Sequence, residues 1–485
     1  MKKLLALLLA LVMILSMAAC GTSEPDPTDP PKDTAPGENP TETQGSQESG
    51  DEGQEEASLN TSWIFAEDPA SVTGTVNFYI PFKGSQGMDA MIAEFNETYP
   101  NVEVVLNTYN NNSDGNAAVN TAILAGEVDV LASFGLSNTY KRWEAAMFYD
   151  LTDLVEENGI DLVEHWGTDA FTYDECIYTF PCGGLSYYIC INMDAWNEAG
   201  LGELPTEWTW DEYIAACEKM TEYNEAGSVA VYGGSDYHSV NYFTYCSAQI
   251  DGLDPYYEAD GTSSFDSEVY LKALQREYDA EVVNKIWYPK ATYRGDNLQT
   301  QQIFLQDQLA NSAVNPNMVR YMTDRENYGT DWKVGFAPWP VEEAGQVNNM
   351  AGVATFSHAG ICIDDSDEDF EAAWAWLRWY STHGVKYLVA AGHQPKWIGT
   401  ETGAALNLLF GSEEEAAKYL DVESFNRVVG RADLPGYIEQ NLTAYSKVDS
   451  ILKEYTMYAL NDQMSPAEAM AEAAKLANEA IQNAG

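Results

Sequence analysis

Polar and apolar residues begin to alternate at the periods of strands and helices near residue 59. Residues 75–81, TVNFYIP, have the pattern of a strand, and apolar residues at helical spacing over 88–99 predict an amphipathic helix that ends at Pro100. The pattern continues with a strand over 102–106, a helix over 117–125 and a strand over 128–132. This order of elements predicts an α/β layer with parallel strands.

Helix starts are marked at two later positions by the form S/T-x-x-E. Thr209–Glu212 and Ser465–Glu468 both predict capping boxes. A further helix is predicted over 370–380, where Trp374, Trp376 and Trp379 cannot all share one face. Part of this helix should therefore contact another element, and we assign the three tryptophans to packing.

The N-terminus has the three-part layout of a secretion signal. Two lysines precede the uncharged apolar residues 4–15, a run too short to span a bilayer, and Ala18 and Ala19 lead into Cys20. Residues 17–21, MAACG, resemble a bacterial lipobox, which implies removal of residues 1–19 and attachment of lipid to Cys20. The alternative is an ordinary cleaved signal with a cysteine there by chance.

We expect residues 20–58 to comprise the lipidated Cys20 and a disordered acidic linker that follows it. Residues 21–57 contain no aromatic or β-branched aliphatic residue and are rich in Pro, Glu, Asp, Ser, Thr and Gly. Such a segment cannot bury enough apolar surface to offset its chain entropy. We expect it to hold the folded part clear of the membrane.

Length and charge narrow the class of protein. The chain has 485 residues, too many for one core, and should form two lobes. Its net charge of −52 argues against nucleic acid and anionic surfaces as partners. The cysteines after Cys20 match no zinc spacing, and Cys176 and Cys182 either pair or remain thiols. We expect no metal and no cofactor.

Several segments occur in the order known from one protein family. They are residues 95–102 (FNETYPNV), 126–130 (GEVDV), 180–181 (FP), 188–192 (YICIN), 205–212 (PTEWTWDE) and 333–340 (KVGFAPWP). In these segments the chain resembles the family 1 extracellular solute-binding proteins of ABC importers, the group that includes maltose-binding protein. The resemblance covers roughly residues 72–482.

The resemblance implies a two-lobed, periplasmic-binding-protein-like (type II) α/β fold with a mainly parallel sheet in each lobe. It places residues 59–181 and 333–383 in the first lobe, and residues 182–332 and 384–485 in the second. A small solute, expected to be a sugar, would bind between the lobes by hinge closure. The resemblance also implies ABC permease subunits as partners, a monomer, no enzymatic activity, and a place on the outer face of a Gram-positive cell membrane.

Candidate ligand contacts follow from the rule that ligands bind at the carboxyl ends of strands. A sugar needs aromatic platforms for its apolar face and polar groups for its hydroxyls. The strand-end candidates are Tyr79, Phe82, Lys83, Tyr109, Asn110, Ser133 and Phe134. The resemblance adds Tyr242, in an aromatic stretch like the one that stacks on sugar, and Asn315, where the family often has tryptophan. Ser186, Tyr237 and Trp339 complete the set. The alternative for each aromatic residue is core packing.

Two other functions remain open at this point. A secreted glycoside hydrolase would need two carboxylates about 5–10 Å apart, and no motif among the 76 acidic residues marks such a pair. The five histidines also show no H-E-x-x-H spacing. A sensory or adhesive receptor could use the same binding fold, and neighbouring permease genes would distinguish transport from that role.

Overall fold

The computed structural model describes most of the chain from residue 59 onward. The described residues are 59–81, 87–167, 172–173, 175–237, 256–258, 260–295, 298–352, 354–400, 404–429, 434, 436 and 443–484. Ser58–Gly485 form one compact unit. No helix in the described ranges has both the length and the apolar character needed to cross a bilayer. The expected signal peptide, Cys20 and the acidic linker lie outside these ranges.

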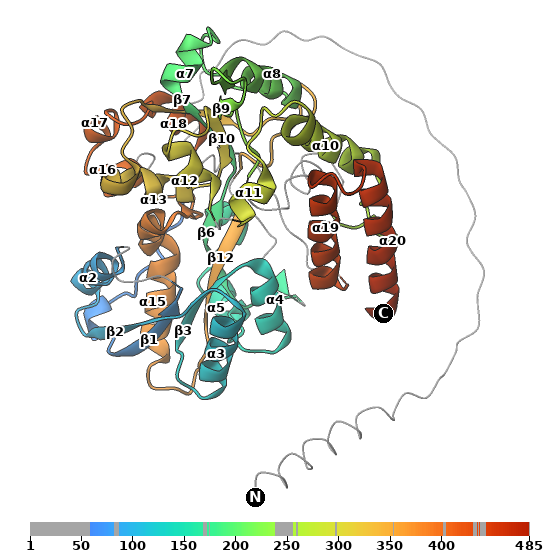
Figure 1. Cartoon of the computed structure of the whole chain (residues 1–485). Coiled ribbons are helices and arrows are strands. Elements are labelled where there is room, and N and C mark those ends of the chain that lie inside the picture. The colour runs from blue at the N-terminus through green and yellow to red at the C-terminus, as the bar shows by residue number, and fades with distance from the viewer. Residues whose placement is uncertain are drawn as a thin grey trace, which may run out of the picture. The chain divides into compact units, whose positions relative to one another are not determined.

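A six-stranded sheet forms the core of the first lobe (Figure 1). Its strands are, in spatial order, β13 (Gln394–Pro395), β6 (Phe180–Leu185), β12 (Ala354–Ile361), β3 (Val130–Phe134), β1 (Gly74–Ile80) and β2 (Val102–Thr108). The predicted parallel pairing is confirmed, because β1 pairs in parallel with both β2 and β3. β12 and β13 run antiparallel to β6 between them.

A three-stranded sheet forms the core of the second lobe. Its order is β10 (Asn311–Val314), β7 (Tyr188–Asn192) and β11 (Val334–Pro338). The expectation of a mainly parallel sheet is corrected here, since β7 is antiparallel to both neighbours. The reason is direction: β7 leads away from the first lobe, whereas β10 and β11 run back toward it.

The sheets also divide the chain differently from the predicted lobe boundaries. β6 extends the first sheet to Leu185, so the change of sheet falls later than residue 181. β11 belongs to the second sheet, although the sequence places residues 333–338 in the first lobe. The segment 333–340 is apolar enough for either sheet, and its pairing partner cannot be read from its pattern. The two-lobed class itself is confirmed.

Helices cover both sheets. Those of the first lobe are α2 (Met88–Thr98), α3 (Ser113–Leu124), α4 (Leu136–Glu144), α5 (Thr152–Glu157), α6 (Leu162–Trp166), α15 (Phe370–Thr382) and the 3-10 helix η4 (Gly384–Ala391). Those of the second are α7 (Met193–Glu198), α8 (Trp210–Met220), α10 (Glu268–Tyr278), the π-helix η3 (Asp279–Val283), α11 (Lys290–Gly295), α12 (Thr300–Leu305), α13 (Asn317–Thr323), α14 (Arg325–Tyr328), α16 (Ala404–Phe410), α17 (Glu413–Ala416), α18 (Val422–Val428), α19 (Tyr445–Leu460) and α20 (Pro466–Ala484).

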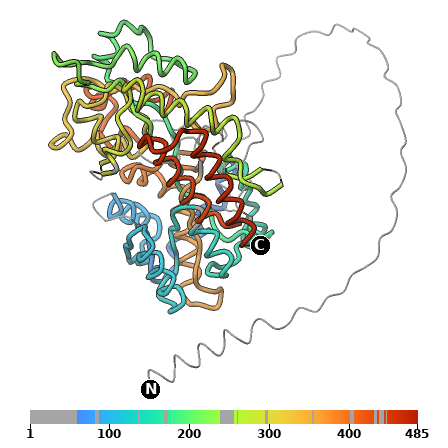
Figure 2. Tube along the Cα trace, turned by 45° about the vertical axis from the view of Figure 1, so that its right-hand side comes forward, coloured from blue at the N-terminus to red at the C-terminus, as the bar shows by residue number. Residues whose placement is uncertain are grey.

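The C-terminal helices form a hairpin beside the second sheet. Figure 2 shows α19 and α20, in red, side by side, and α10 contacts both of them. Both predicted capping boxes are present: the Thr209 hydroxyl accepts from the Glu212 N–H, and the Ser465 hydroxyl accepts from the Glu468 N–H. Each glutamate carboxylate accepts the reciprocal N–H bond, so both helix starts are satisfied locally.

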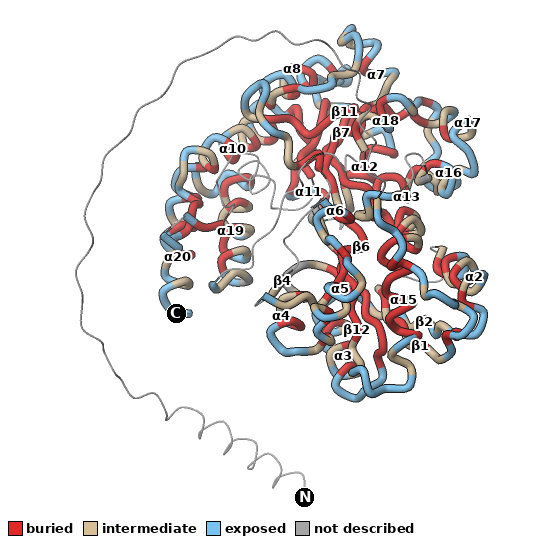
Figure 3. Tube along the Cα trace, turned by 180° about the vertical axis from the view of Figure 1, so that it is seen from behind, coloured by how far each residue is buried: buried red, intermediate tan, exposed pale blue. Residues whose placement is uncertain are grey.

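The helix α15 is buried over nearly its whole length, as are β7 and β11 (Figure 3). It packs against β1, β6 and β12 of the first sheet. Trp376 lies edge-on to Phe78 and Phe95, with ring centroids 5.1 and 4.9 Å away. Trp374 and Trp379 are buried as well, which confirms their assignment to packing.

The sequence alone does not determine whether Cys176 and Cys182 form a disulfide. Cys176 and Cys182, both in described ranges, are not joined by a disulfide. Cys182, Cys190 and Cys217 are buried in the hydrophobic clusters, where a thiol acts as a small apolar group.

Replacing Trp376 with alanine should lower the free energy of unfolding by about 3–5 kcal/mol, because a fully buried indole leaves a cavity that the sheet cannot close. Chemical denaturation measures this change. Leu124→Ala is the control in the same lobe, since Leu124 is 77 % exposed and its loss should change stability by no more than about 0.5 kcal/mol. Equal effects of the two substitutions would contradict the packing described for α15.

Candidate functional site

The carboxyl ends of strands from both sheets meet where the chain passes from β6 to β7. β6 ends at Leu185 and β7 begins at Tyr188, so only Ser186 and Tyr187 separate the two sheets. In the first sheet, Leu185 lies opposite Ala354, where β12 begins. In the second sheet, Tyr188 lies opposite Val314 and Pro338, where β10 and β11 end. The residues that follow β6, β10 and β11 are thus brought to one region.

Three of the predicted contacts lie in this region of the second lobe. Asn315 follows β10 and Trp339 follows β11, and the Tyr188 hydroxyl donates to the Asn315 carbonyl oxygen at 3.3 Å. The Asn315 side-chain amide donates to the Tyr237 hydroxyl at 2.7 Å. Asn315 and Tyr237, which are far apart in the sequence, are therefore directly joined.

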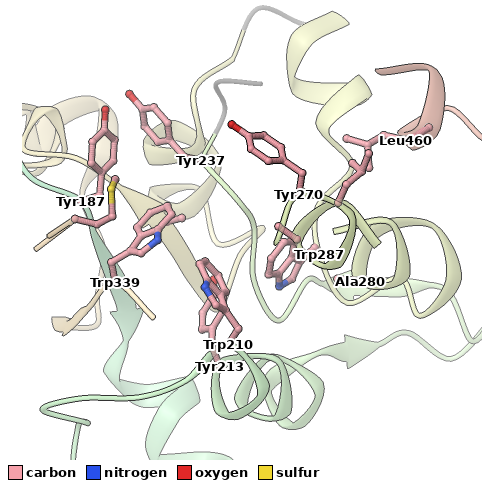
Figure 4. Packing of buried hydrophobic residues seen from close by; sticks show 14 of the residues in the cluster. Tyr187, Trp210, Tyr213, Tyr237, Tyr270, Ala280, Trp287, Trp339 and Leu460 are labelled. Carbon is pink, nitrogen blue, oxygen red and sulfur yellow. The ribbon is translucent and has the colours of Figure 1, made fainter. Parts of the chain in front are cut away.

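A group of aromatic rings lies beside this pair (Figure 4). The Tyr187 ring is edge-on to Tyr237 and to Trp339, with centroids 5.5 and 5.7 Å away. Trp339 in turn lies edge-on to Trp210 at 5.6 Å. Trp339 is fully buried, so its ring supports Tyr187 from the core side. Sequence reasoning did not single out Tyr187, although the adjacent tyrosines 187 and 188 at the change of sheet are a usable signal.

Ser186 is the remaining predicted residue in this region. Its side chain is fully buried, and its hydroxyl has no hydrogen-bond partner among the described residues. An unpaired buried hydroxyl carries a desolvation cost of about 1–3 kcal/mol. Ser186 is therefore a buried polar group at the change of sheet whose hydrogen-bonding capacity the described residues leave unused.

Two predicted residues of the first lobe are occupied by the protein itself. The Ser133 hydroxyl accepts from the guanidinium of Arg142 at 2.6 Å and shares a hydrogen bond with Thr139 at 2.8 Å. The Tyr109 hydroxyl donates to the Ala132 carbonyl oxygen at 2.8 Å, and burial raises the pKa of Tyr109 to about 12. These bonds tie β3 to α4 and to the segment after β2, and they do not bring Ser133 or Tyr109 to the β6–β7 connection, so we leave both out of the site.

The other predicted contacts differ in how far they are buried and in whether the structure describes them. Phe134 is 2 % exposed and packs against Phe356 and His393, and Tyr79 packs against the cluster around Leu131. Asn110 is exposed at the end of β2. Phe82, Lys83 and Tyr242 lie outside the described residues, and their roles stay predictions.

Comparison with known proteins identifies the family. The family model for bacterial extracellular solute-binding proteins matches residues 82–387, more than half of the chain. The chain belongs to this family. A search of curated proteins finds no match.

Solved structures share the fold of this solute-binding protein at low sequence identity. One is a sugar transporter from Rhizobium etli in an open conformation (TM-score 0.65, 15 % identity, 83 % of this chain and 99 % of that one). Another is an ABC substrate-binding protein from Listeria monocytogenes in complex with cycloalternan (TM-score 0.60, 19 % identity, 84 % of this chain and 98 % of that one). A third is maltose-bound MalE3 of T. maritima (TM-score 0.60, 18 % identity, 83 % of this chain and 98 % of that one).

A fully buried ionic cluster holds the segment that carries Tyr237. The Lys290 ammonium pairs with the carboxylates of Asp236 and Glu277, and the Lys290 N–H donates to Glu281 at 3.0 Å. The Lys290, Asp236 and Glu277 side chains have no exposed surface. Because Asp236 directly precedes Tyr237, this cluster fixes where that tyrosine meets Asn315. In the described ranges no group of His, Cys, Asp and Glu side chains is arranged to hold a metal ion.

The cluster should make stability depend on pH. Burial raises the pKa of Glu281 well above its usual range, and the Glu277 carboxylate raises that pKa further. The Glu281 carboxyl therefore holds its proton to a higher pH in the folded state than in the unfolded chain. This contribution to stability is fully present below the unfolded pKa of about 4.3 and is lost as pH rises through the folded pKa.

Replacing Glu281 with glutamine should therefore make the free energy of unfolding depend less on pH. In the wild type this carboxyl should make the free energy of unfolding rise as pH falls from above its folded-state pKa toward its unfolded pKa of about 4.3. Glu281→Gln should lose most of this gain, as urea denaturation at several pH values would show. Glu218→Gln, at an exposed position of α8, controls for the loss of one charge. A variant that keeps the full gain would rule out Glu281 as its source.

Proposed function

We propose that this protein is the solute-capturing subunit of an ABC importer and that its solute is a neutral sugar or polyol. The observation that carries the proposal is the meeting of strand carboxyl ends from both sheets at Ser186 and Tyr187 in a member of the solute-binding family. In α/β folds such ends form the ligand site. The proposed contacts are Ser186, Tyr187, Tyr237 and Asn315.

The chemistry of these four residues supports a neutral, hydroxyl-rich ligand. Their side chains are hydroxyl, amide and aromatic groups, which can donate to and accept from sugar hydroxyls and cover an apolar face. An anionic solute would call for arginine or lysine at the contacts. Two of the structures with the same fold contain cycloalternan and maltose, which supports the same class of ligand.

Capture would occur by closure of the two lobes. Only two residues connect β6 to β7, so rotation there brings groups of both lobes onto a bound solute. A solute stabilises the closed state only by its greater affinity for that state. A solute that contacts groups of both lobes in the closed state, and of one lobe in the open state, would have this greater affinity.

The place of the protein in the cell is part of the proposal. We infer that lipid on Cys20 holds it on the outer face of the membrane and that residues 21–58 act as a tether. The lipobox-like segment 17–21 supports this. Two or more acyl chains give stable anchoring, at about 0.8 kcal/mol per buried CH2.

Purified protein should be stabilised by a sugar or polyol. In a thermal-shift screen with maltose, maltotriose, D-glucose and D-mannitol, at least one should stabilise the fold by about 2.7 kcal/mol at a hundredfold excess over its Kd. Spermidine and a mixed tripeptide are the comparison ligands. Stabilisation by these alone would overturn the sugar proposal, and turnover of a nitrophenyl glycoside would favour the hydrolase alternative.

Lipidation is tested in cells. The wild-type chain should incorporate labelled palmitate and sediment with membranes, because its acyl chains insert into the bilayer. Cys20→Ser should incorporate no label and appear in the medium. Cys176→Ser, at a cysteine of the folded part, is the control and should still be labelled. Label retained by Cys20→Ser would contradict anchoring at this residue.

A further inference from the structure

Gln394 in β13 is a buried glutamine. Its side chain is 6 % exposed, and neither its amide oxygen nor its amide nitrogen has a hydrogen-bond partner among the described residues. An amide offers two acceptor sites and two donors, so the unused capacity is large. Buried polar groups are hydrogen-bonded in the great majority of cases, and exceptions call for an explanation.

The position of Gln394 points to the same region as the proposed site. Gln394 pairs with Gly184 of β6, two residues before Ser186. Ser186 follows the end of β6, so Gln394 and Ser186 both lie at the same end of the β6–β13 pairing. The Ser186 hydroxyl is buried and also without a partner among the described residues. Two buried polar side chains without a partner among the described residues therefore lie toward the same end of this pairing, where the chain passes from one sheet to the other.

The second lobe reaches this region too. A side chain at Gly392 would meet the backbone of Asn317 at 2.7 Å, so the approach to β13 lies directly against the start of α13. The Asn317 N–H in turn donates to the side-chain oxygen of Asn315 at 3.1 Å. Gln394 thus lies two residues from the point where the first lobe touches the segment that carries Asn315.

We propose that Gln394 is a ligand-binding residue that, with Ser186, hydrogen-bonds the hydroxyl groups of the captured sugar or polyol. This inference rests on the proposed function and extends it to β13. A neutral amide and a hydroxyl can each donate and accept, which matches hydroxyl groups and does not match a carboxylate or phosphate. Among the described residues neither group has a partner, so a ligand that reaches this region would satisfy hydrogen bonds that these residues leave unmade.

Gln394→Met separates a binding role from a structural one. Methionine keeps the length of the side chain and removes both polar atoms, so the melting temperature of the free protein should stay equal or rise. The Kd for the member of the maltose, maltotriose, D-glucose and D-mannitol panel that stabilises the wild type should weaken at least about tenfold. Titration calorimetry on the full chain measures this change. Ser186→Ala should weaken the same Kd in the same direction.

Gln301→Met is the matched control for the stability of the free protein. Gln301 is also fully buried, but its amide nitrogen donates to Asn315 and its oxygen accepts from Thr300. Its loss should lower the melting temperature, unlike that of Gln394. A similar fall for Gln394→Met, or an unchanged Kd, would overturn the role of Gln394. A wild type that none of the panel stabilises would instead reject the sugar-binding function itself.

Discussion

Ser186 and Tyr187 alone separate β6 of the first sheet from β7 of the second sheet. This covalent constraint forces the end of β6 and the start of β7 to lie side by side, and hydrogen bonding then brings their neighbours along. Leu185 fixes the start of β12, while Tyr188 fixes the ends of β10 and β11. The region where both lobes contribute side chains follows from this one short connection.

Side chains around the connection differ in whether they have hydrogen-bond partners among the described residues. Asn315 and Tyr237 bind each other, and the buried pairing of Lys290 with Asp236 holds the tyrosine in place. Burying ions is costly unless they are paired, so such a cluster fixes geometry rather than adding much stability. Ser186 and Gln394, by contrast, are left unsatisfied among the described residues. A rigid frame with a few unsatisfied polar groups is the arrangement expected of a preorganised binding site.

Local signals predicted local structure well. The period of apolar residues gave β1, α2 and β2 close to their observed bounds, and the Thr209 and Ser465 capping boxes are present because they depend only on residues three apart. Pairing between distant strands was not readable in this way. β11 is found in the second sheet and β7 is antiparallel, since these features depend on partners far along the chain. The same limit applies to the site: Ser133 follows the strand-end rule, but only the fold brings Arg142 to its hydroxyl. Gln394 has no sequence signal, because only the fold shows that its amide is buried without a partner among the described residues.

A crystal structure of the protein with the best-binding sugar of the screen tests the central claim most directly. The account predicts that the sugar lies at the connection between β6 and β7, against Tyr187 or Tyr237, with hydroxyls within hydrogen-bond distance of Ser186 and Gln394. A sugar bound elsewhere, with these two side chains still making no contact to it, would contradict the account.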